Sequence, residues 1–311
     1  MPQLSFEFYI STKVALAITY GKNILMLEND LQQWLKSARQ ESAKGKLPNY
    51  IPLLAQADPQ AIAIAIQKVN GDHLTAGDLE LTFPLMSVIK PFLLLYLLET
   101  KGSEQVFRIV DSQVTSEPFN AIPRGKPKNS MINSGAIALS SQLASCATLQ
   151  SWLNQRSGTN LKLDLEVLAS VRSVANRRNL AIADQLKNMG IIANPSKALA
   201  IYEEICCLRG NVQDLAKLGT LLVYTQRSSN IPIVLEVMTK CGMYESSAEF
   251  AQNIGVPSKS SISGALLSII PDQAAISCYS PALDATGNSV SGLFLIRKIK
   301  NYVLGLGREE S

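Results

Sequence analysis

Hydrophobic and polar residues form blocks whose spacing changes along the 311-residue chain. Apolar residues at helical spacing predict a helix over 31–40. Two apolar runs, 61–69 and 74–83, then flank Asn70-Gly71, a pair that favours the tight turn matching the twist of paired strands. This part of the chain therefore predicts a β-hairpin.

The middle of the chain is helical in pattern. Its apolar residues predict six helices, over 87–101, 134–146, 149–156, 178–189, 197–208 and 212–224. An irregular connection rich in Pro and Gly, 117–133, lies between the first two. Long connections of this kind in a compact domain more often serve function than structure.

Strand patterns return after residue 241. Runs over 264–270 and 274–279 predict a second strand pair, and a final helix is expected over 290–304. Strands from both chain ends around an inserted helical block predict an α/β (α+β) fold with one mixed, mainly antiparallel sheet. Residues 1–29, with FEFYIST and VALAITY, read either as short strands or as an upstream extension.

The length allows one large domain or two lobes that share a cleft. We expect a single domain over 30–307. Its sheet lobe would come from 46–84 and 241–307, and its helical lobe from 85–240, with the cleft between them.

Composition narrows the class of function. Apolar residues make up 47% of the chain and charged residues 17%, as in a globular protein with a sizeable core. The net charge of +4 is spread without a basic block, so no nucleic-acid partner is expected. The longest apolar run, 91–98, is far shorter than the ~20 residues that cross a bilayer, so no membrane association is expected.

The cysteines and the N-terminal residues bear on location. The five cysteines lack the spacing of a disulfide framework, which indicates a reducing compartment. The first residues show no cationic start followed by an apolar core and a cleavage site. We therefore expect a cytoplasmic protein.

Ser87 and Lys90 are the first candidates for chemistry. Residues three apart on a helix lie on one face, with Cβ atoms roughly 5–6 Å apart. A serine becomes a nucleophile when a neighbouring base takes its proton, and a desolvated, neutral lysine can be that base. Ser-x-x-Lys is the arrangement of serine amidases of the penicillin-recognising type. On this motif alone, a helix-capping serine followed by a solvated lysine is the alternative.

Pro91 and His73 bear on the chemistry of this motif, the first through the start of the helix and the second through the alternatives to it. Pro91 is tolerated only in the first turn of a helix, so the helix should begin close to Ser87 and leave the serine at an electropositive N-terminus. His73, the only histidine, is expected to be a solvated residue of the hairpin turn. A Ser-His-Asp triad and a multi-histidine metal site are then not expected, and we expect no metal and no cofactor.

Six stretches, in order, resemble the serine-dependent glutaminases, whose fold is similar to that of the serine β-lactamases and penicillin-binding proteins. The resemblance covers about residues 31–307. It implies hydrolysis of L-glutamine to L-glutamate and ammonia through an acyl-serine, without a cofactor, by a homodimer or homotetramer. The six stretches are GDLELTFPLMSVIKP (77–91), NSMINSGAI (129–137), NRRNLAIA (176–183), CGMYESSAEFA (241–251), IGVPSKSSISG (254–264) and SPALDATGNSVSG (280–292).

The resemblance implies a role for each matched residue. Ser87 matches the nucleophile, and Lys90 and Tyr244 match the pair that shares proton transfer, with the first base left open. The backbone N–H of Ile262 matches the partner of the Ser87 N–H in an oxyanion hole. The remaining substrate-binding matches are Asn133, Asn179, Tyr202 and Tyr50.

Each of these matches also has an ordinary structural interpretation. Asn133 could cap the helix that follows it, because asparagine favours that position. Asn179 and Tyr202 could be surface or core residues of helices, and Tyr244 a turn residue.

The chain departs from the family's pattern at four places. Met86 replaces a glutamine before the nucleophile, Ser261 replaces a glycine, and the segment 117–120 is shortened. Arg172 stands where the family has a glutamate that holds the α-ammonium of the substrate. A cation that points into the pocket there would repel an ammonium group, and losing such a charge pair costs roughly 2–5 kcal/mol.

Three explanations of Arg172 are open from the sequence. Its side chain could face solvent, Glu166 or Glu117 could supply the carboxylate, or the substrate could lack the amine or carry a second carboxylate. The alternative function is accordingly a protein of this fold with an altered amide substrate, or one with little catalysis and a binding or regulatory role.

Overall fold

The structure is a computed structural model of the chain and describes residues 29–174 and 177–303. The expectations for FEFYIST and VALAITY, and those for the last residues of the chain, lie outside this part. Most of the segment 1–29 is outside it as well.

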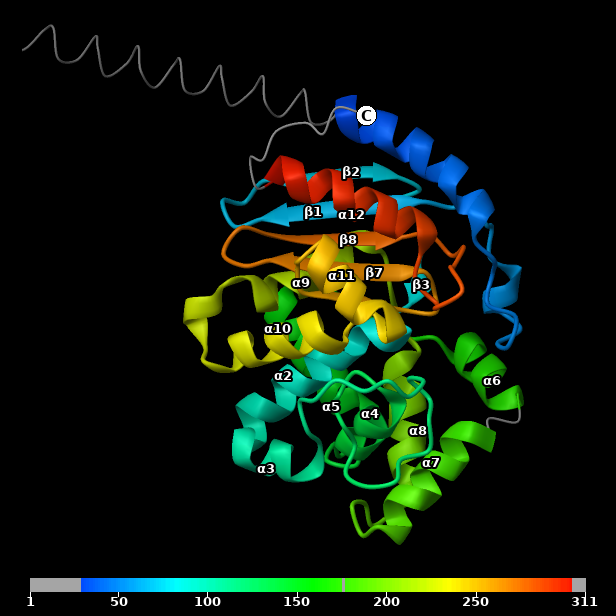
Figure 1. Ribbon diagram of the computed structural model, residues 1–311, viewed down its shortest axis with the longest axis vertical. Helices are drawn as coiled ribbons and strands as arrows, with labels where there is room; N and C mark the ends of the chain where they lie inside the picture. The colour runs from blue at the N-terminus through cyan, green and yellow to red at the C-terminus, as the bar shows by residue number, and fades with distance from the viewer. Residues whose placement is uncertain (1–28, 175–176, 304–311) are drawn as a thin grey trace, which may run out of the picture.

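A five-stranded sheet forms the upper half of the molecule in Figure 1. Its strand order is β2-β1-β8-β7-β6, and every pairing between neighbours is antiparallel. Strands from the two ends of the chain meet where β1 pairs with β8, so the predicted sheet is confirmed. The strands are β1 (Ala63–Lys68), β2 (His73–Gly77), β6 (Ser258–Ser260), β7 (Ala265–Ile270) and β8 (Ala274–Tyr279).

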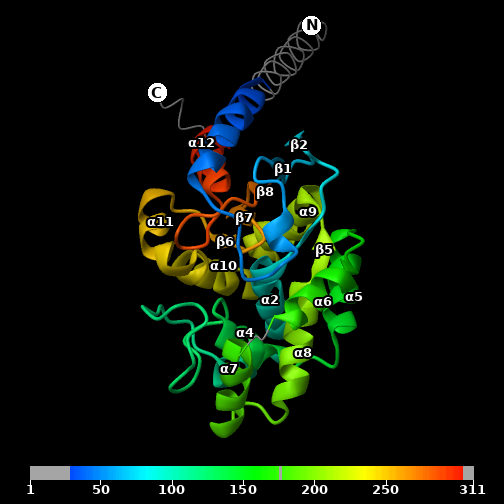
Figure 2. The same ribbon diagram turned by 90° about the vertical axis from the view of Figure 1, so that its right-hand side faces the viewer.

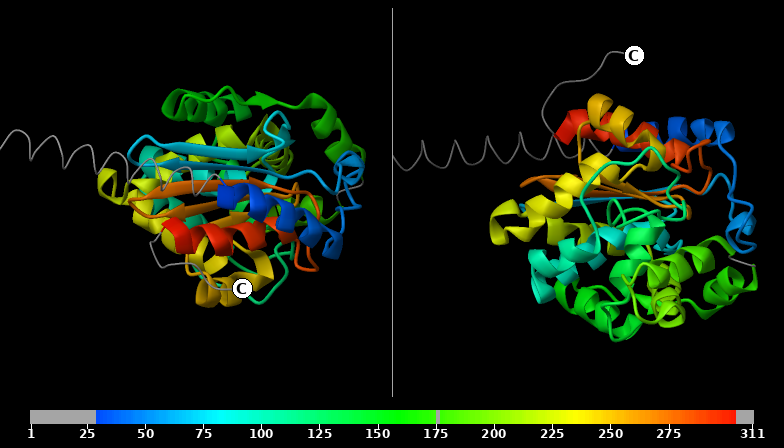
Figure 3. Two further views of the ribbon diagram at one scale, coloured as in Figure 1. Left: turned by 90° about the horizontal axis from the view of Figure 1, so that it is seen from above. Right: turned by 60° about the horizontal axis from the view of Figure 1, so that its bottom comes forward.

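Helices cover both faces of the sheet. Alternate residues of a strand point in opposite directions, so each strand contributes side chains to both cores. In β1, Ala63 and Ala65 pack toward α9 (Val212–Val223), whereas Ile64 and Ile66 pack toward a helix over 29–41 and toward α12 (Val290–Val303). The helix over 29–41 and α12 lie side by side on one face (Figure 3), and Ser291 Oγ donates a hydrogen bond to the Ala38 carbonyl at 2.7 Å.

Gly219 allows α9 to lie close against the sheet. A Cβ added there would come within 2.6 Å of the Ala275 Cβ and 2.9 Å of Leu267 Cδ1. Replacing Gly219 with leucine should therefore lower the free energy of unfolding by about 1–3 kcal/mol, because the overpacked helix must shift. Urea unfolding measures this. The exposed Lys217→Ala on the same helix is the control, and equal stabilities of the two variants would contradict the packing argument.

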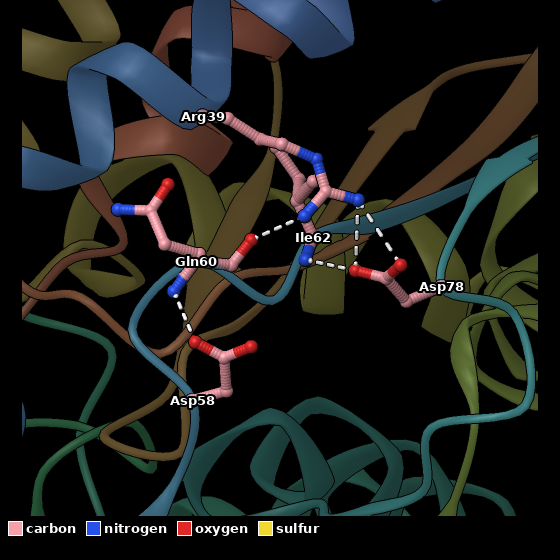
Figure 4. A network of polar contacts seen from close by, with 5 residues as sticks. All are labelled: Arg39, Asp58, Gln60, Ile62 and Asp78. Atoms are coloured by element: carbon pink, nitrogen blue, oxygen red, sulfur yellow. Dashed lines mark hydrogen bonds and ion pairs between the residues drawn. The ribbon is translucent and has the colours of Figure 1, made fainter.

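Arg39 ties the helix over 29–41 to the first hairpin (Figure 4). Its guanidinium donates to both Asp78 carboxylate oxygens at 3.0 Å and to the Gln60 carbonyl at 2.6 Å. The same carboxylate accepts a hydrogen bond from the Ile62 N–H at 2.9 Å. One arginine thus fixes the edge of the sheet to the helix that covers it.

The helical half lies below the sheet in Figures 1 and 2. α2 runs through its interior, and a small antiparallel sheet of order β3-β5-β4 joins the two halves. The elements are α2 (Lys90–Lys101), α3 (Ser103–Ile109), α4 (Asn133–Ser140), α5 (Cys146–Ser157), α6 (Leu165–Ser173), α7 (Arg177–Asn188), α8 (Pro195–Cys206), α10 (Asn230–Cys241), α11 (Ser247–Asn253), β3 (Phe83–Pro84), β4 (Lys162–Leu163) and β5 (Leu208–Gly210). Short 3₁₀ turns are η1 (Ser42–Lys44), η2 (Leu54–Gln56), η3 (Met86–Ile89), η4 (Thr225–Arg227) and η5 (Tyr244–Ser246).

The helix at 31–40 and the six predicted central helices are present, as is the final helix over its described part. α4 is shorter than predicted and ends at Ser140, and α5 begins earlier, at Cys146. The elements α3, α6, α10, α11, β6 and the small sheet were not predicted. α3, α6 and α11 are too short to show a repeated pattern, and α10 is rich in β-branched residues, which have low helix propensity.

The first hairpin turns at Asn70-Gly71 as predicted, and Gly71 takes a positive φ of 93°. His73 is exposed, as expected, but it is the first residue of β2 and pairs with Gln67. It therefore follows the turn and does not form part of it. Within the described residues, no helix is long and apolar enough to cross a membrane.

Candidate active site

A cavity of about 1030 Å³ opens between the sheet half and the helical half. Ser87 lines it, together with residues of the segment 44–51, of α6 and α8, and of the loops at 262 and 283–287. In Figure 1 the segment after the blue N-terminal helix descends at the right of the view toward α6. The cavity thus draws its wall from parts of the chain far apart in sequence.

Ser87 lies in η3, which leads directly into α2. Pro91 occupies the first turn of α2, where its missing N–H costs no hydrogen bond, as the sequence predicted. Met86, also in the cavity wall, has a φ of +47°, a left-handed conformation that is uncommon for a non-glycine residue. Strained residues of this kind cluster at functional sites. The nucleophile candidate therefore sits on a sharp turn at the cavity wall.

Lys90 is completely buried beneath Ser87's turn. Its ammonium donates to the Met131 carbonyl at 3.0 Å and to Asn133 Oδ1 at 2.9 Å. Burial lowers the pKa of Lys90 to about 8, because the charged form loses its hydration. A lysine in this condition is partly neutral near physiological pH and can accept a proton.

Asn133 is the centre of the polar network. Its Oδ1 also accepts from the Tyr202 hydroxyl at 3.0 Å, and its Nδ2 donates to Asn179 Oδ1 at 3.0 Å. Its backbone N–H donates to the Phe119 carbonyl at 2.8 Å. The structure therefore brings Lys90, Asn133, Asn179 and Tyr202 into one hydrogen-bonded set, and the last three line the cavity.

Tyr244 lies in η5 with a φ of +52°. Its ring packs between Phe119, at 4.8 Å between centroids, and the Lys259 ammonium, 4.3 Å from the ring centroid. Burial raises the pKa of Tyr244 above its usual range, and the neighbouring Ser87 opposes part of this shift. Its buried hydroxyl meets no described residue with hydrogen-bond geometry, so it stands beside Ser87 as an uncommitted donor.

Ile262 lines the cavity from the loop after β6, and its N–H donates to no described backbone or side-chain acceptor. The preceding Ser261 is fully buried, and its hydroxyl donates to the Leu85 carbonyl at 2.9 Å. Ser261 does not take a positive φ, so a serine fits there without strain. Its side chain joins the loop that carries Ile262 to the segment that carries Ser87.

Tyr50 lines the cavity and remains 50% exposed, which places it at the rim. In the shortened segment, Phe119 and Asn120 line the same cavity. Although the segment is shortened, its Phe119 still lines the cavity and contacts the Tyr244 ring.

Arg172 is not among the residues that line the cavity. Its guanidinium extends to α8, where Nε lies 3.1 Å from a Glu203 carboxylate oxygen and an Nη lies 3.5 Å from Glu204. Glu203 itself lines the cavity. Neither Glu166 nor Glu117 lines it, and both are exposed.

A family model described as Glutaminase matches residues 45–304 of the chain. The chain belongs to the glutaminase family. A glutaminase from Synechocystis sp. is 39% identical over 287 residues, which cover 87% of this chain and 88% of that protein. Glutaminase 2 from Bacillus subtilis is 31% identical and covers 86% of this chain and 94% of its own length.

Solved glutaminase structures have the same fold. The probable glutaminase ybaS superposes with a TM-score of 0.81 at 30% identity, covering 89% of this chain and 97% of its own. A probable glutaminase from Bacillus subtilis complexed with 6-diazo-5-oxo-L-norleucine superposes with a TM-score of 0.79 at 26% identity, covering 88% and 94%. The predicted family and its serine β-lactamase-like fold are confirmed, and the chain is an amidohydrolase of the glutaminase family.

The sequence-based prediction did not assign three residues that the structure places in or beside the cavity of this candidate site. Glu203 and Cys206 line the cavity from α8, and Lys259 lies against the Tyr244 ring. Burial raises the pKa of Cys206 to about 11, so it is a neutral thiol. The sequence signal for Glu203 is a pair of acidic residues, Glu203-Glu204, within the mostly apolar stretch 198–208.

Among the residues that the structure describes, no cluster of three or more His, Cys, Asp or Glu side chains forms a metal site. All five cysteines are buried and free. The polar residues of the cavity wall include serine, lysine, tyrosine, asparagine, glutamate, aspartate, threonine and arginine.

Proposed function

We propose that the chain hydrolyses L-glutamine to L-glutamate and ammonia through an acyl intermediate on Ser87. The observation that carries the proposal is the buried, partly neutral Lys90, which is hydrogen-bonded to Asn133 one helical turn from Ser87 at the cavity wall. We take L-glutamine as the substrate because the relatives of this chain are glutaminases. Asn133, Asn179, Tyr202 and the rim residue Tyr50 contact it.

Lys90 is the first base in this proposal. Its neutral amine takes the Ser87 proton while the serine oxygen bonds to the carboxamide carbon of the substrate. Tyr244 is unsuited to this step, because its raised pKa keeps it protonated. The different pKa shifts of the two residues separate the base from the acid.

Tyr244 then acts as the acid. Its phenol gives a proton to the departing nitrogen, which leaves as ammonia when the C–N bond breaks, and the Lys90 ammonium returns the proton to Tyr244. The reaction leaves a glutamyl ester on Ser87. Water attacks this ester and gives a proton to Lys90. Lys90 passes that proton to the Ser87 oxygen as the ester bond breaks, which releases glutamate and restores the Ser87 hydroxyl and the neutral amine.

The developing oxyanion is held by two backbone N–H groups, those of Ser87 and Ile262. The unpaired N–H of Ile262 supports this assignment. Each donor of this kind contributes roughly 3 kcal/mol to the stability of the transition state. Ser261 positions the second donor through its hydrogen bond to Leu85.

Rapid acid quenching during turnover tests the proposal. Mass spectrometry should find a glutamyl group on the peptide that carries Ser87, and a coupled assay should detect ammonia released from glutamine. The same peptide from Ser87→Ala should carry no added mass. Ammonia release without an adduct, at a rate unchanged by this substitution, would contradict the mechanism.

The missing carboxylate at position 172 leaves one alternative function. Because a cation replaces the carboxylate expected there, the protein would act on an amide without an α-amine, or would bind ligand with little turnover. Glutamine turnover in the ordinary enzyme range, on the order of 1–10³ per second, would exclude both versions.

We further propose that residues 30–307 act as one catalytic domain, since both halves line the cavity. The five free, buried thiols support a cytoplasmic location. A homodimer or homotetramer follows from the family resemblance, and light scattering coupled to size exclusion would test it.

A further inference from the structure

The charged residues in the cavity wall are unevenly distributed. Three cations and two acids line the cavity, and one of the cations, Lys44, is already paired with Glu41. The acids are Glu203 and Asp284, and the cations are Lys44, Lys46 and Arg178.

Asp284 is already committed to its own loop. Its Oδ1 accepts hydrogen bonds from the Thr286 N–H and hydroxyl and from the Asn288 N–H, at 2.8–2.9 Å. These contacts shape the turn over 284–288. Its carboxylate therefore has a structural function that a ligand would have to share.

Glu203 is placed differently. It is only 9% exposed, and one carboxylate oxygen, Oε2, is paired with Arg172, whereas Oε1 accepts no hydrogen bond from a described residue. Glu203 lines the cavity, so an ammonium group that enters there can pair with this carboxylate in a charge-assisted hydrogen bond.

Glu203 is also next in the chain to a residue of the hydrogen-bonded network around Lys90. It follows Tyr202 in α8, and the Tyr202 hydroxyl shares Asn133 Oδ1 with the Lys90 ammonium. Adjacent residues of α8 thus carry this carboxylate and the hydroxyl that joins the network of the catalytic lysine. A ligand held by Glu203 can extend its other end toward Ser87.

Arg172 accounts for the position of Glu203. Its guanidinium reaches Glu203 and Glu204 from α6, outside the cavity wall. Burial raises the pKa of Glu203 and the adjacent Arg172 lowers it, so the arginine favours the ionised form. Arg172 thus supports a negative charge in the pocket and does not oppose the positive charge of a substrate.

We infer that Glu203 receives the α-ammonium of the substrate and that Arg172 is the positioning residue that holds Glu203 in place. This inference rests on the proposed hydrolysis of glutamine. In this chain the carboxylate that binds the ammonium is therefore Glu203 on α8, and not the residue at position 172 on α6. Arg172 pairs with that carboxylate.

Binding measured without turnover tests the inference independently of the reaction. In the Ser87→Ala background, calorimetry compares L-glutamine with glutaramate, which is glutamine without its α-amine. Glu203→Gln should weaken L-glutamine binding about 30-fold or more and leave glutaramate binding nearly unchanged. Equal losses for the two ligands, or no loss for glutamine, would overturn the inference even if the wild-type chain turns over glutamine.

Glu204→Gln is the matched control. It removes the other acidic partner of Arg172 from the next position of the same helix, but Glu204 is not among the cavity-lining residues. Glutamine binding should change far less than in Glu203→Gln. If Glu203→Gln does not fold, Glu203→Asp serves instead. It must still bind glutamine in preference to glutaramate, and loss of that preference would overturn the inference.

Replacing Arg172 with methionine tests the positioning function through pH. Without the cation, the pKa of Glu203 should rise further, so the carboxylate is protonated at higher pH. KM for glutamine should then begin to increase at a higher pH than in wild type as the solution is acidified, while kcat changes little. A KM profile that coincides with that of wild type would overturn the assignment of Arg172.

Discussion

Replacing Ser87 with alanine should reduce ammonia release from glutamine by about 10⁴-fold or more. The variant keeps the cavity, the oxyanion donors and Lys90, but it has no oxygen that can form the ester. Binding should survive, because the removed hydroxyl forms a bond only during reaction. A loss of kcat with little change in ligand affinity is therefore expected.

A surface serine provides the control for this substitution. Ser37 lies on the helix over 29–41, where its hydroxyl donates a hydrogen bond to the Gln33 carbonyl at 3.3 Å. Ser37→Ala should retain wild-type activity. Residual activity of Ser87→Ala within tenfold of wild type would mean that another group attacks the amide.

Lys90→Met should lower kcat by about 10²–10⁴-fold, the usual contribution of a general base. Methionine fills similar space in the buried site but cannot accept a proton. The control is Lys101→Met, an exposed lysine at the other end of α2 that should leave the rate unchanged. A variant as active as wild type would remove Lys90 from the mechanism.

The pKa of Lys90 gives the same prediction a pH dependence. The base is active only when neutral, and burial lowers its pKa to about 8. The neutral fraction, and with it kcat, should rise about tenfold between roughly pH 7 and pH 9. Lys90→Met should lose this rise. A wild-type profile that falls over the same interval would contradict Lys90 as the base.

The local pattern of the sequence was sufficient for the periodic elements. The Asn70-Gly71 turn depends on residues next to one another and lies where it was predicted. The strand before it is also present, whereas the strand after it ends at Gly77 and not at Phe83 as predicted, because Asp78 leaves the sheet to bond to Arg39. Pro91 located the start of α2 for the same reason, because a missing N–H is tolerated only in a first turn. Short segments such as α3 and α11 were not predicted, since one or two turns carry too little periodicity.

The candidate site was found by the order of its motifs, but its contacts come from far along the chain. Asn133 bonds to Asn179 and Tyr202, which lie 46 and 69 residues away. No local pattern specifies such a pair, because it exists only when α4, α7 and α8 pack together. The assignment of Lys90 as the base likewise depends on burial, which the fold provides.

Sequence alone determined the family, the Ser87–Lys90 motif and the absence of a carboxylate at position 172. Only the tertiary structure decided where the Arg172 side chain goes. Its guanidinium turns to α8 and pairs with Glu203, whose carboxylate lines the cavity. The physical reason is that a side chain's partner depends on how its helix is rotated against the next one, and helix packing follows from contacts made across the whole chain.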